Sequence, residues 1–179
     1  RGGVEAGNRN LIVNRQLEMN ILLMGPIVIA IILLLPIAIP LLYNSQFLGV
    51  LGMTQIAAAG LLWKSFYLPL EYIQECCCVL LLIVCEILGY LWFGLDGLGA
   101  GIVVAYVLES VGVFVFCHVH YAYRLSFQAG KHLMVHLLNL LLIGGVVWMW
   151  DAGSWSYWLL GLFLFLASLA YSLSKIHQV

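Results

Sequence analysis

Three ionisable side chains, Lys64, Glu86 and Glu109, stand inside long apolar segments of this chain. On insertion scales, placing a charged side chain at the centre of a membrane helix costs about 2.5–3.5 kcal/mol. Charged residues at such positions are therefore the first candidates for a functional role. An ion pair of Lys64 with either Glu86 or Glu109 would lower that cost. The pair could lock the helix register, or it could bind a substrate or a coupling ion, and the sequence leaves both interpretations open.

Counting from the nearest predicted turn places two of these charges at similar depths. Lys64 precedes Gln74 by ten residues, and Glu86 follows Glu75 by eleven. On neighbouring antiparallel helices, similar distances from a shared turn predict similar depth, because each residue adds the same rise. Glu109 also lies near the middle of its own apolar segment.

Residues spaced three or four apart share one face of a helix, and three of the apolar segments carry faces of small, polar and aromatic groups. These faces are Ala57, Gly60, Lys64, Tyr67 and Glu71; Tyr106, Glu109, Val113, Phe116, His120 and Arg124; and His132, His136 and Asn139. Such faces are expected to point at the interior of a bundle or at a water-filled cavity. We predict that the three faces line one cavity, with plain helix packing as the alternative.

Candidate roles follow from the chemistry of these side chains. The predicted substrate-binding residues are Lys64, Tyr67, Tyr106, Glu109 and His120, and the predicted ion-pairing or coupling residues are Glu86 and Glu71. His132 and His136 stand at i and i+4, but no Glu follows the first His as the H-E-x-x-H metal pattern requires. The chain also lacks a G-x-S-x-G elbow and a Walker loop. We therefore predict no catalytic residue, no metal site and no cofactor.

The composition decides the class of protein that must position these residues. Of the 179 residues, 64% are apolar and only 8% are charged. A soluble domain of this length is unable to bury so much apolar surface, and a disordered chain needs the opposite composition. Seven Lys and Arg against eight Asp and Glu form no basic patch for nucleic acid. The remaining class is an integral membrane protein in contact with membrane lipid.

Six segments reach the length of about 20 apolar residues that an α-helix needs to cross a bilayer. They run over about 17–43, 51–74, 76–93, 98–123, 133–150 and 155–174. The long segments lack the alternation of β-barrel strands, which predicts an all-α membrane bundle over residues 17–174. Residues 1–16 are expected to form a cytoplasmic loop and residues 175–179 a cytoplasmic tail. Gly97 and Gly101 form a GxxxG pattern that predicts close helix packing.

Basic residues predict the orientation of the bundle. Outside the predicted spans the chain carries them at Arg1, Arg9, Arg15, Arg124, Lys131 and Lys175, which six spans place on one side. The loops near Asn44, Asp96 and Asp151, on the other side, carry no Lys or Arg. The positive-inside rule therefore predicts that both ends of the chain are cytoplasmic. Because the chain opens with Arg-Gly-Gly and has no initiator Met, we expect it to be a piece of a longer protein.

Five strings along the chain, in order, resemble one transporter family. They are Val13–Glu18; Leu41–Phe47; Leu62-Trp63-Lys64 continuing through Leu68–Ile73; Phe93–Gly101 followed by Tyr106; and Tyr123–Phe127. Together they resemble the C-terminal half of bacterial polysaccharide and lipid-linked oligosaccharide flippases, in the multidrug/oligosaccharidyl-lipid/polysaccharide exporter superfamily. The chain departs from that pattern at Gln74–Cys78, where the family usually has a basic turn.

The resemblance implies a MATE-like transporter of twelve to fourteen helices in two bundles, of which this chain is one and an N-terminal bundle is missing. It implies export of undecaprenyl-pyrophosphate-linked oligosaccharide across the bacterial inner membrane by alternating access, with Lys64 as a cavity cation that meets the pyrophosphate. Two alternatives stay open. One is a multidrug or cation antiporter of the same superfamily in which Glu86 or Glu109 binds the coupling ion. The other is a six-helix membrane scaffold without transport.

Overall fold

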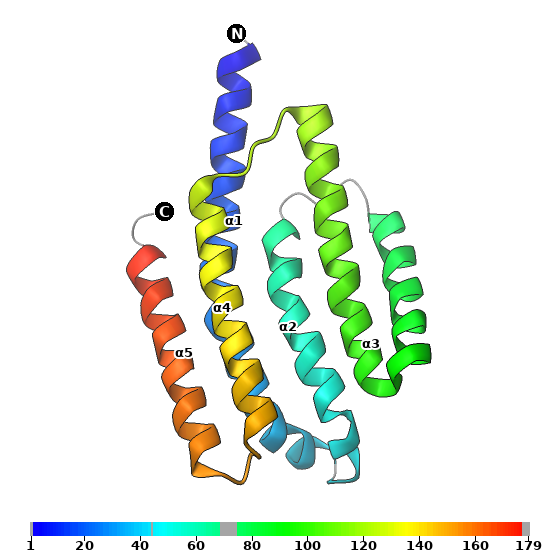
Figure 1. Cartoon of the computed structure of the whole chain (residues 1–179). Coiled ribbons are helices and arrows are strands. Elements are labelled where there is room, and N and C mark those ends of the chain that lie inside the picture. The colour runs from blue at the N-terminus through cyan, green and yellow to red at the C-terminus, as the bar shows by residue number, and fades with distance from the viewer. Residues whose placement is uncertain (1, 44, 69–74, 177–179) are drawn as a thin grey trace.

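The computed structural model of the chain describes residues 2–43, 45–68 and 75–176. These residues form five α-helices and one 3-10 helix (Figure 1). The helices are α1 (Gly2–Leu42), η1 (Ser45–Val50), α2 (Leu51–Tyr67), α3 (Glu75–Tyr121), α4 (Phe127–Met149) and α5 (Trp155–Ile176). No strand occurs among the described residues, which confirms the predicted all-α class.

Five helical segments of the described chain are long and apolar enough to cross a membrane. They cover 10–42, 46–67, 79–121, 127–149 and 155–176. Large apolar side chains on their outer faces are exposed, including Leu91, Leu141 and Phe163 at about 70%. In a soluble protein such a surface would aggregate, whereas against lipid it is the expected exterior. The membrane class predicted from composition is therefore confirmed.

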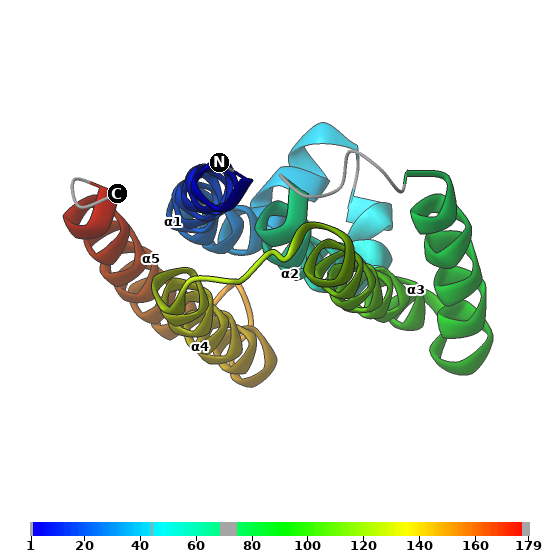
Figure 2. The same ribbon diagram turned by 90° about the horizontal axis from the view of Figure 1, so that it is seen from above.

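The helix α3 reverses direction at Gly94, so it consists of two antiparallel arms, residues 75–93 and 95–121 (Figures 1 and 2). Gly94 has a φ of 66° and a ψ of −140°, a conformation open essentially to glycine alone. The arms pack backbone to backbone, since a Cβ at Gly97 or Gly101 would overlap the carbonyl of Gly89 or Cys85. The close packing predicted from the GxxxG pattern is thus confirmed, and the predicted 94–97 turn falls at this reversal.

Helix α1 forms the centre of the packing, since α2, α4 and α5 all contact it. Its side chains Leu17, Ile21 and Ile29 are completely buried. The helix has 41 residues, a length of about 60 Å at 1.5 Å per residue, which exceeds the ~30 Å hydrocarbon thickness. The loop predicted for residues 1–16 is wrong, because residues from Gly2 onward are helical. This segment contains no proline, so nothing in it interrupts the backbone bonds of the helix.

Two helix ends differ from the predicted spans. Helix α2 ends at Tyr67 rather than at Gln74, two residues before Pro69, whose ring and missing N–H disfavour a continued helix. Residues 69–74, and with them Glu71, lie outside the described residues. Helix α4 begins at Phe127 rather than at residue 133, because Ser126 caps it. At the other helix ends the predicted and observed bounds differ by at most three residues, except at the N-terminus of α1.

The ends of the helices segregate into two levels. The N-terminus of α1, the C-terminal end of α5 and the link between α3 and α4 lie at the upper end in Figure 1. The reversal of α3, η1 and the link between α4 and α5 lie at the lower end (Figure 1). Basic residues such as Arg124 and Lys175 were predicted to share one side of the membrane. Their segments, the link between α3 and α4 and the C-terminal end of α5, both lie at the upper end (Figure 1). Seen from above, α5 and the first arm of α3 lie at opposite edges (Figure 2).

Candidate functional site: an ion pair between α2 and α3

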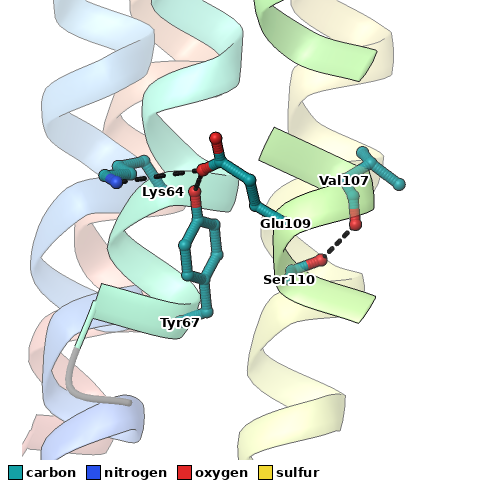
Figure 3. Close-up of polar contacts among 5 residues, drawn as sticks. All are labelled: Lys64, Tyr67, Val107, Glu109 and Ser110. Atoms are coloured by element: carbon teal, nitrogen blue, oxygen red, sulfur yellow. Dashed lines mark hydrogen bonds and ion pairs between the residues drawn. The ribbon is translucent and has the colours of Figure 1, made fainter. Parts of the chain in front are cut away.

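An ion pair joins α2 to the second arm of α3 in the interior of the membrane segment. The Nζ atom of Lys64 lies 3.9 Å from Oε2 of Glu109 (Figure 3). The two side chains differ in burial, because 30% of the Lys64 side chain is exposed and only 2% of that of Glu109. Of the two pairs predicted for Lys64, the one with Glu109 is confirmed. It neutralises a carboxylate that would otherwise be buried as an uncompensated charge.

Tyr67 is the second partner of Glu109. Its hydroxyl donates a short hydrogen bond to Oε2, the same oxygen that faces Lys64 (Figure 3). Tyr67 is completely buried. It follows Lys64 by three residues, so the two side chains leave α2 on the same face, as the spacing predicted. The negative charge on Oε2 of Glu109 is therefore stabilised by two groups, the Tyr67 hydroxyl and the Lys64 ammonium group. Both groups come from α2.

Two tyrosine rings flank the Lys64 ammonium group. Its Nζ atom lies 5.2 Å from the ring centroid of Tyr67 and 5.6 Å from that of Tyr106. Both distances are within the ~6 Å over which a cation is attracted to an aromatic face, an interaction of about 0.5–2 kcal/mol. The predicted residues Lys64, Tyr67, Tyr106 and Glu109 therefore form one cluster, which we call the Lys64 cluster.

Glycines allow the two helices that carry the cluster to approach. A Cβ at Gly60 would lie 3.1 Å from the Tyr106 ring, and one at Gly99 would lie 2.5 Å from the carbonyl oxygen of Met53. These contacts show that α2 and the second arm of α3 run in parallel at close range. Ser110, next to Glu109, is buried and donates its hydroxyl to the Val107 carbonyl of its own helix (Figure 3). Its polar group is therefore satisfied without using the Glu109 carboxylate.

Glu86 lies on the first arm of α3 at a different level. The contact of Gly101 with the backbone of Cys85 and with Cα of Glu86 places Glu86 beside Gly101. Glu109 is eight residues beyond Gly101, or about 12 Å along the helix at 1.5 Å per residue. The prediction that Lys64 and Glu86 share one depth is therefore wrong. The count began at Gln74, although α2 ends seven residues earlier at Tyr67.

His120 lies apart from the Lys64 cluster. It is exposed at the C-terminal end of α3, eleven residues beyond Glu109, or about 16 Å of helix rise. Its ring stacks on Phe116, with centroids 4.3 Å apart, and its Nδ1 lies 3.3 Å from the Phe116 carbonyl oxygen. The structure therefore does not bring His120 together with Lys64.

The polar stripe of α4 packs against α5 rather than lining a cavity with the Lys64 cluster. His136 is completely buried, with Nδ1 3.2 Å from the Ser168 hydroxyl and Nε2 3.3 Å from the Ser172 hydroxyl. Nδ1 of His132 lies 2.8 Å from the hydroxyl of Tyr171. The prediction of one shared cavity for all three faces is wrong for this stripe. Hydroxyl groups at matching positions of α5 satisfy the imidazoles and turn them into packing residues.

A second polar cluster, absent from the sequence predictions, ties α1 to the link before α4. The Asn14 amide donates to the carbonyl of Arg124 at 3.0 Å, and its Oδ1 accepts from the Tyr123 hydroxyl at 2.8 Å and the Ser126 N–H at 2.7 Å. Ser126 also donates to Glu18 at 2.5 Å. Burial raises the pKa of the Tyr123 hydroxyl above its usual range, with smaller contributions in the same direction from nearby groups including Glu18. A Ser before a helix is a recognisable N-cap signal, but its partners on α1 are more than 100 residues away.

An apolar groove of about 530 Å³ lies elsewhere, between α1 and α5. Its lining includes Leu22, Pro26, Phe165 and Ile176 and carries no charged residue, so it offers nothing to an ionic ligand. Within the described residues no group of three His, Cys, Asp or Glu side chains is arranged to hold a metal ion. The Lys64 cluster, in contrast, brings together an ammonium group, a carboxylate and two aromatic rings.

Comparisons with family models, with curated proteins and with solved structures gave no match to this chain. The chemistry of the Lys64 cluster thus has to be inferred from its own geometry. A half-buried ammonium group on two tyrosine rings can bind an anion, and the buried carboxylate behind it can balance the ammonium charge when no anion is present. Binding of an anion and balancing of the ammonium charge are properties of an ion-binding site. They do not describe a catalytic nucleophile or a metal site.

Proposed function

We propose that this chain is one six-helix bundle of a transporter that moves an anionic lipid-linked oligosaccharide across the bacterial inner membrane by alternating access. In this proposal the two arms of α3 cross the membrane separately and give six crossings. A second, N-terminal bundle completes a MATE-like protein of twelve to fourteen helices. Both ends of the chain are cytoplasmic, because the basic residues gather there.

The observation that carries the proposal is the Lys64 ammonium group, which is partly exposed within a membrane segment. A charge held at this depth is costly unless it serves a purpose, and Lys64 keeps 30% of its side chain accessible instead of being sealed behind Glu109. The pyrophosphate of a polyprenyl-linked saccharide is an anion that an ammonium group can bind. The half-buried ring of Tyr106 fits the proposal, since aromatic faces also pack against sugar rings, whereas the Tyr67 ring is completely buried.

The proposed role of Lys64 is tested by substitution in the full-length protein that carries this chain. Loss of one charge-assisted contact, about 1.5–3 kcal/mol, should lower transport by roughly 10- to 100-fold in Lys64→Ala. The readout is surface polysaccharide in cells whose own flippase is deleted, at matched protein levels. Lys64→Arg should keep part of the activity, and Lys175→Ala, at the end of α5, serves as the control. Normal polysaccharide in Lys64→Ala would remove the proposed role.

A second candidate is a multidrug or cation antiporter, and one observation favours it. The Lys64 ammonium group lies against two aromatic rings and beside a buried carboxylate. The same rings and carboxylate could bind an organic cation in place of the ammonium group. The two candidates differ in the charge that the site must retain. An antiporter needs Glu109 and tolerates loss of Lys64, whereas the flippase needs Lys64. Drug resistance in Glu109→Gln and Lys64→Ala cells therefore separates them.

A further inference from the structure

The apolar groove between α1 and α5 has the width of one hydrocarbon chain. On α1 it is lined from Leu22 to Ala38, a length of about 24 Å at 1.5 Å per residue. A volume of about 530 Å³ spread over that length corresponds to a mean width of about 5 Å. A helix with its side chains is about 10–12 Å across, whereas carbon atoms in contact lie only about 3.5–4 Å apart. The groove is therefore too narrow for a further helix and fits an acyl chain.

The walls of the groove have the chemistry that a lipid tail requires. Ser172 is the polar side chain of the lining, and its hydroxyl lies 3.3 Å from Nε2 of His136. The other lining residues are apolar, and Leu23, Ile27 and Leu34 among them are about half exposed. Because these side chains belong to the outer surface of a membrane bundle, hydrocarbon of the bilayer reaches the groove directly. The groove is also longer than the ~15 Å depth of one leaflet, so it accepts a whole acyl chain.

Arg15 lies on the face of α1 that forms the groove, beyond the upper end of the groove. It precedes Leu22 by seven residues, or about two turns, and its side chain is exposed. The rise between these residues is about 10 Å, and the headgroup layer extends about 5–8 Å beyond the hydrocarbon core. The long, flexible arginine side chain bridges the difference. A guanidinium group binds a phosphate through two parallel hydrogen bonds.

Two other charged side chains near this end face α4 instead of the groove. The Glu18 carboxylate accepts a hydrogen bond of 2.5 Å from the Ser126 hydroxyl, which lies in the link before α4. Lys175 follows Tyr171 by four residues and so shares the face of α5 whose Tyr171 hydroxyl contacts His132. Arg15 is therefore the charged side chain that the groove face presents at this end.

We propose that the groove binds one anionic phospholipid of the cytoplasmic leaflet, with an acyl chain between α1 and α5 and the phosphate on Arg15. The cytoplasmic leaflet carries the negative surface charge, and the basic end of the bundle faces it in the proposed orientation. This site is separate from the Lys64 cluster. It takes its orientation from the proposed function but does not depend on transport.

Native mass spectrometry of the purified chain tests the headgroup contact, with palmitoyl-oleoyl phosphatidylglycerol and phosphatidylcholine as probes. The two lipids have the same acyl chains, so the ratio of their affinities reports the headgroup alone. One basic residue near an anionic headgroup is worth about fivefold in affinity, and we expect the wild type to prefer phosphatidylglycerol by about that factor. Arg15→Gln should bind both lipids equally. Lys131→Gln, which removes an exposed charge at the same end but from α4, should keep the preference.

A second pair of variants tests the groove itself. Ala30 is a half-buried lining residue, so a phenylalanine at this position would fill the space of the acyl chain. Ala167 is exposed on α5 and does not line the groove, which makes Ala167→Phe the matched control. Loss of only two buried CH₂ groups corresponds to about tenfold in affinity. We therefore expect Ala30→Phe to weaken binding of both lipids at least tenfold and Ala167→Phe to bind as the wild type does.

Four outcomes would overturn the proposal. Equal affinity of the wild type for the two lipids, or an unchanged preference in Arg15→Gln, removes the headgroup contact. Equal lipid binding by Ala30→Phe and Ala167→Phe removes the groove as the site. A wild-type dimer that becomes monomeric in Ala30→Phe assigns the groove to a second copy of the chain. A preference that is present in the chain but lost in the full-length protein assigns the groove to the N-terminal bundle.

The lipid titration is independent of the proposed transport function. It requires no activity of Lys64, so loss of the lipid preference leaves the role of the Lys64 cluster in place, and loss of transport in Lys64→Ala leaves the lipid site in place. The comparison of the two lipids on the wild type decides the headgroup contact even if Ala30→Phe fails to fold.

Discussion

Replacing Asn14 should release the link before α4 from α1. The Asn14 side chain has three long-range hydrogen bonds of 2.7–3.0 Å, with Tyr123, Arg124 and Ser126. Its fourth bond, 2.8 Å to the Asn10 carbonyl, is local to the helix. A typical hydrogen bond adds about 1 kcal/mol net, and a buried donor left without an acceptor costs about 1–3 kcal/mol. We therefore expect Asn14→Ala to lower the free energy of unfolding by about 3–4 kcal/mol.

Asn20 on the same helix provides a matched control for this variant. Its side chain makes one bond to the Ser65 carbonyl, and at 3.4 Å this bond is longer than a usual N–H···O contact. Asn20→Ala should therefore cost less than about 1 kcal/mol. Both variants remove the same side chain from neighbouring turns of α1, so the change in helix propensity is nearly the same and cancels in the comparison.

The assay is reversible unfolding of the purified chain by SDS in mixed micelles, followed by circular dichroism. A double-mutant cycle with Tyr123→Phe isolates the bond between Asn14 and the Tyr123 hydroxyl, for which we expect a coupling of about 1 kcal/mol. Equal destabilisation by Asn14→Ala and Asn20→Ala would refute the argument. So would additivity of the Asn14 and Tyr123 substitutions, because residues in direct contact should couple.

Three further predictions follow from single positions. Gly97→Leu should destabilise the chain far more than Gly112→Leu, as measured by SDS unfolding, because a Cβ at Gly97 overlaps the Gly89 backbone whereas open space surrounds Gly112. Gly94→Ala should cost about 1–3 kcal/mol through its φ of 66°, and a neutral result would contradict the reversal described for α3. Because the pKa of Tyr123 is raised by burial, the unfolded chain ionises this group first, so stability should fall as the pH rises above about 10. Tyr123→Phe should show a shallower fall than the wild type.

The sequence allowed the membrane class and the Lys64–Glu109 pair to be predicted for physical reasons. Apolar length is a local property, and a charge in an apolar segment needs a partner of opposite sign near its own depth. Tyr67 was predicted correctly because a spacing of three fixes its face relative to Lys64. The choice between Glu86 and Glu109 depended on the true end of α2 at Tyr67, which no local signal other than Pro69 indicates.

Other features depended on contacts between distant segments, which spacing within one helix does not reveal. From the spacing in α4, the His136 imidazole could face either a cavity or a neighbouring helix. It faces a helix because the Ser168 and Ser172 hydroxyls of α5 lie within hydrogen-bond distance of its two nitrogens. The same holds for Asn14, whose partners come from the link before α4. The helical start of α1 was missed because its polar residues and glycines resemble a loop in composition, although the segment contains no proline.

Transport by the full-length protein in proteoliposomes tests the central claim, that Lys64 is the cation of an anion-carrying site. A fluorescent polyprenyl-pyrophosphate saccharide is placed in both leaflets, and its transfer is followed by quenching with an impermeant reductant. We predict that the wild type moves the pyrophosphate lipid, and that Lys64→Ala slows this movement by at least tenfold while Lys175→Ala does not. Equal transfer rates in Lys64→Ala and wild-type vesicles of equal protein content would contradict the claim.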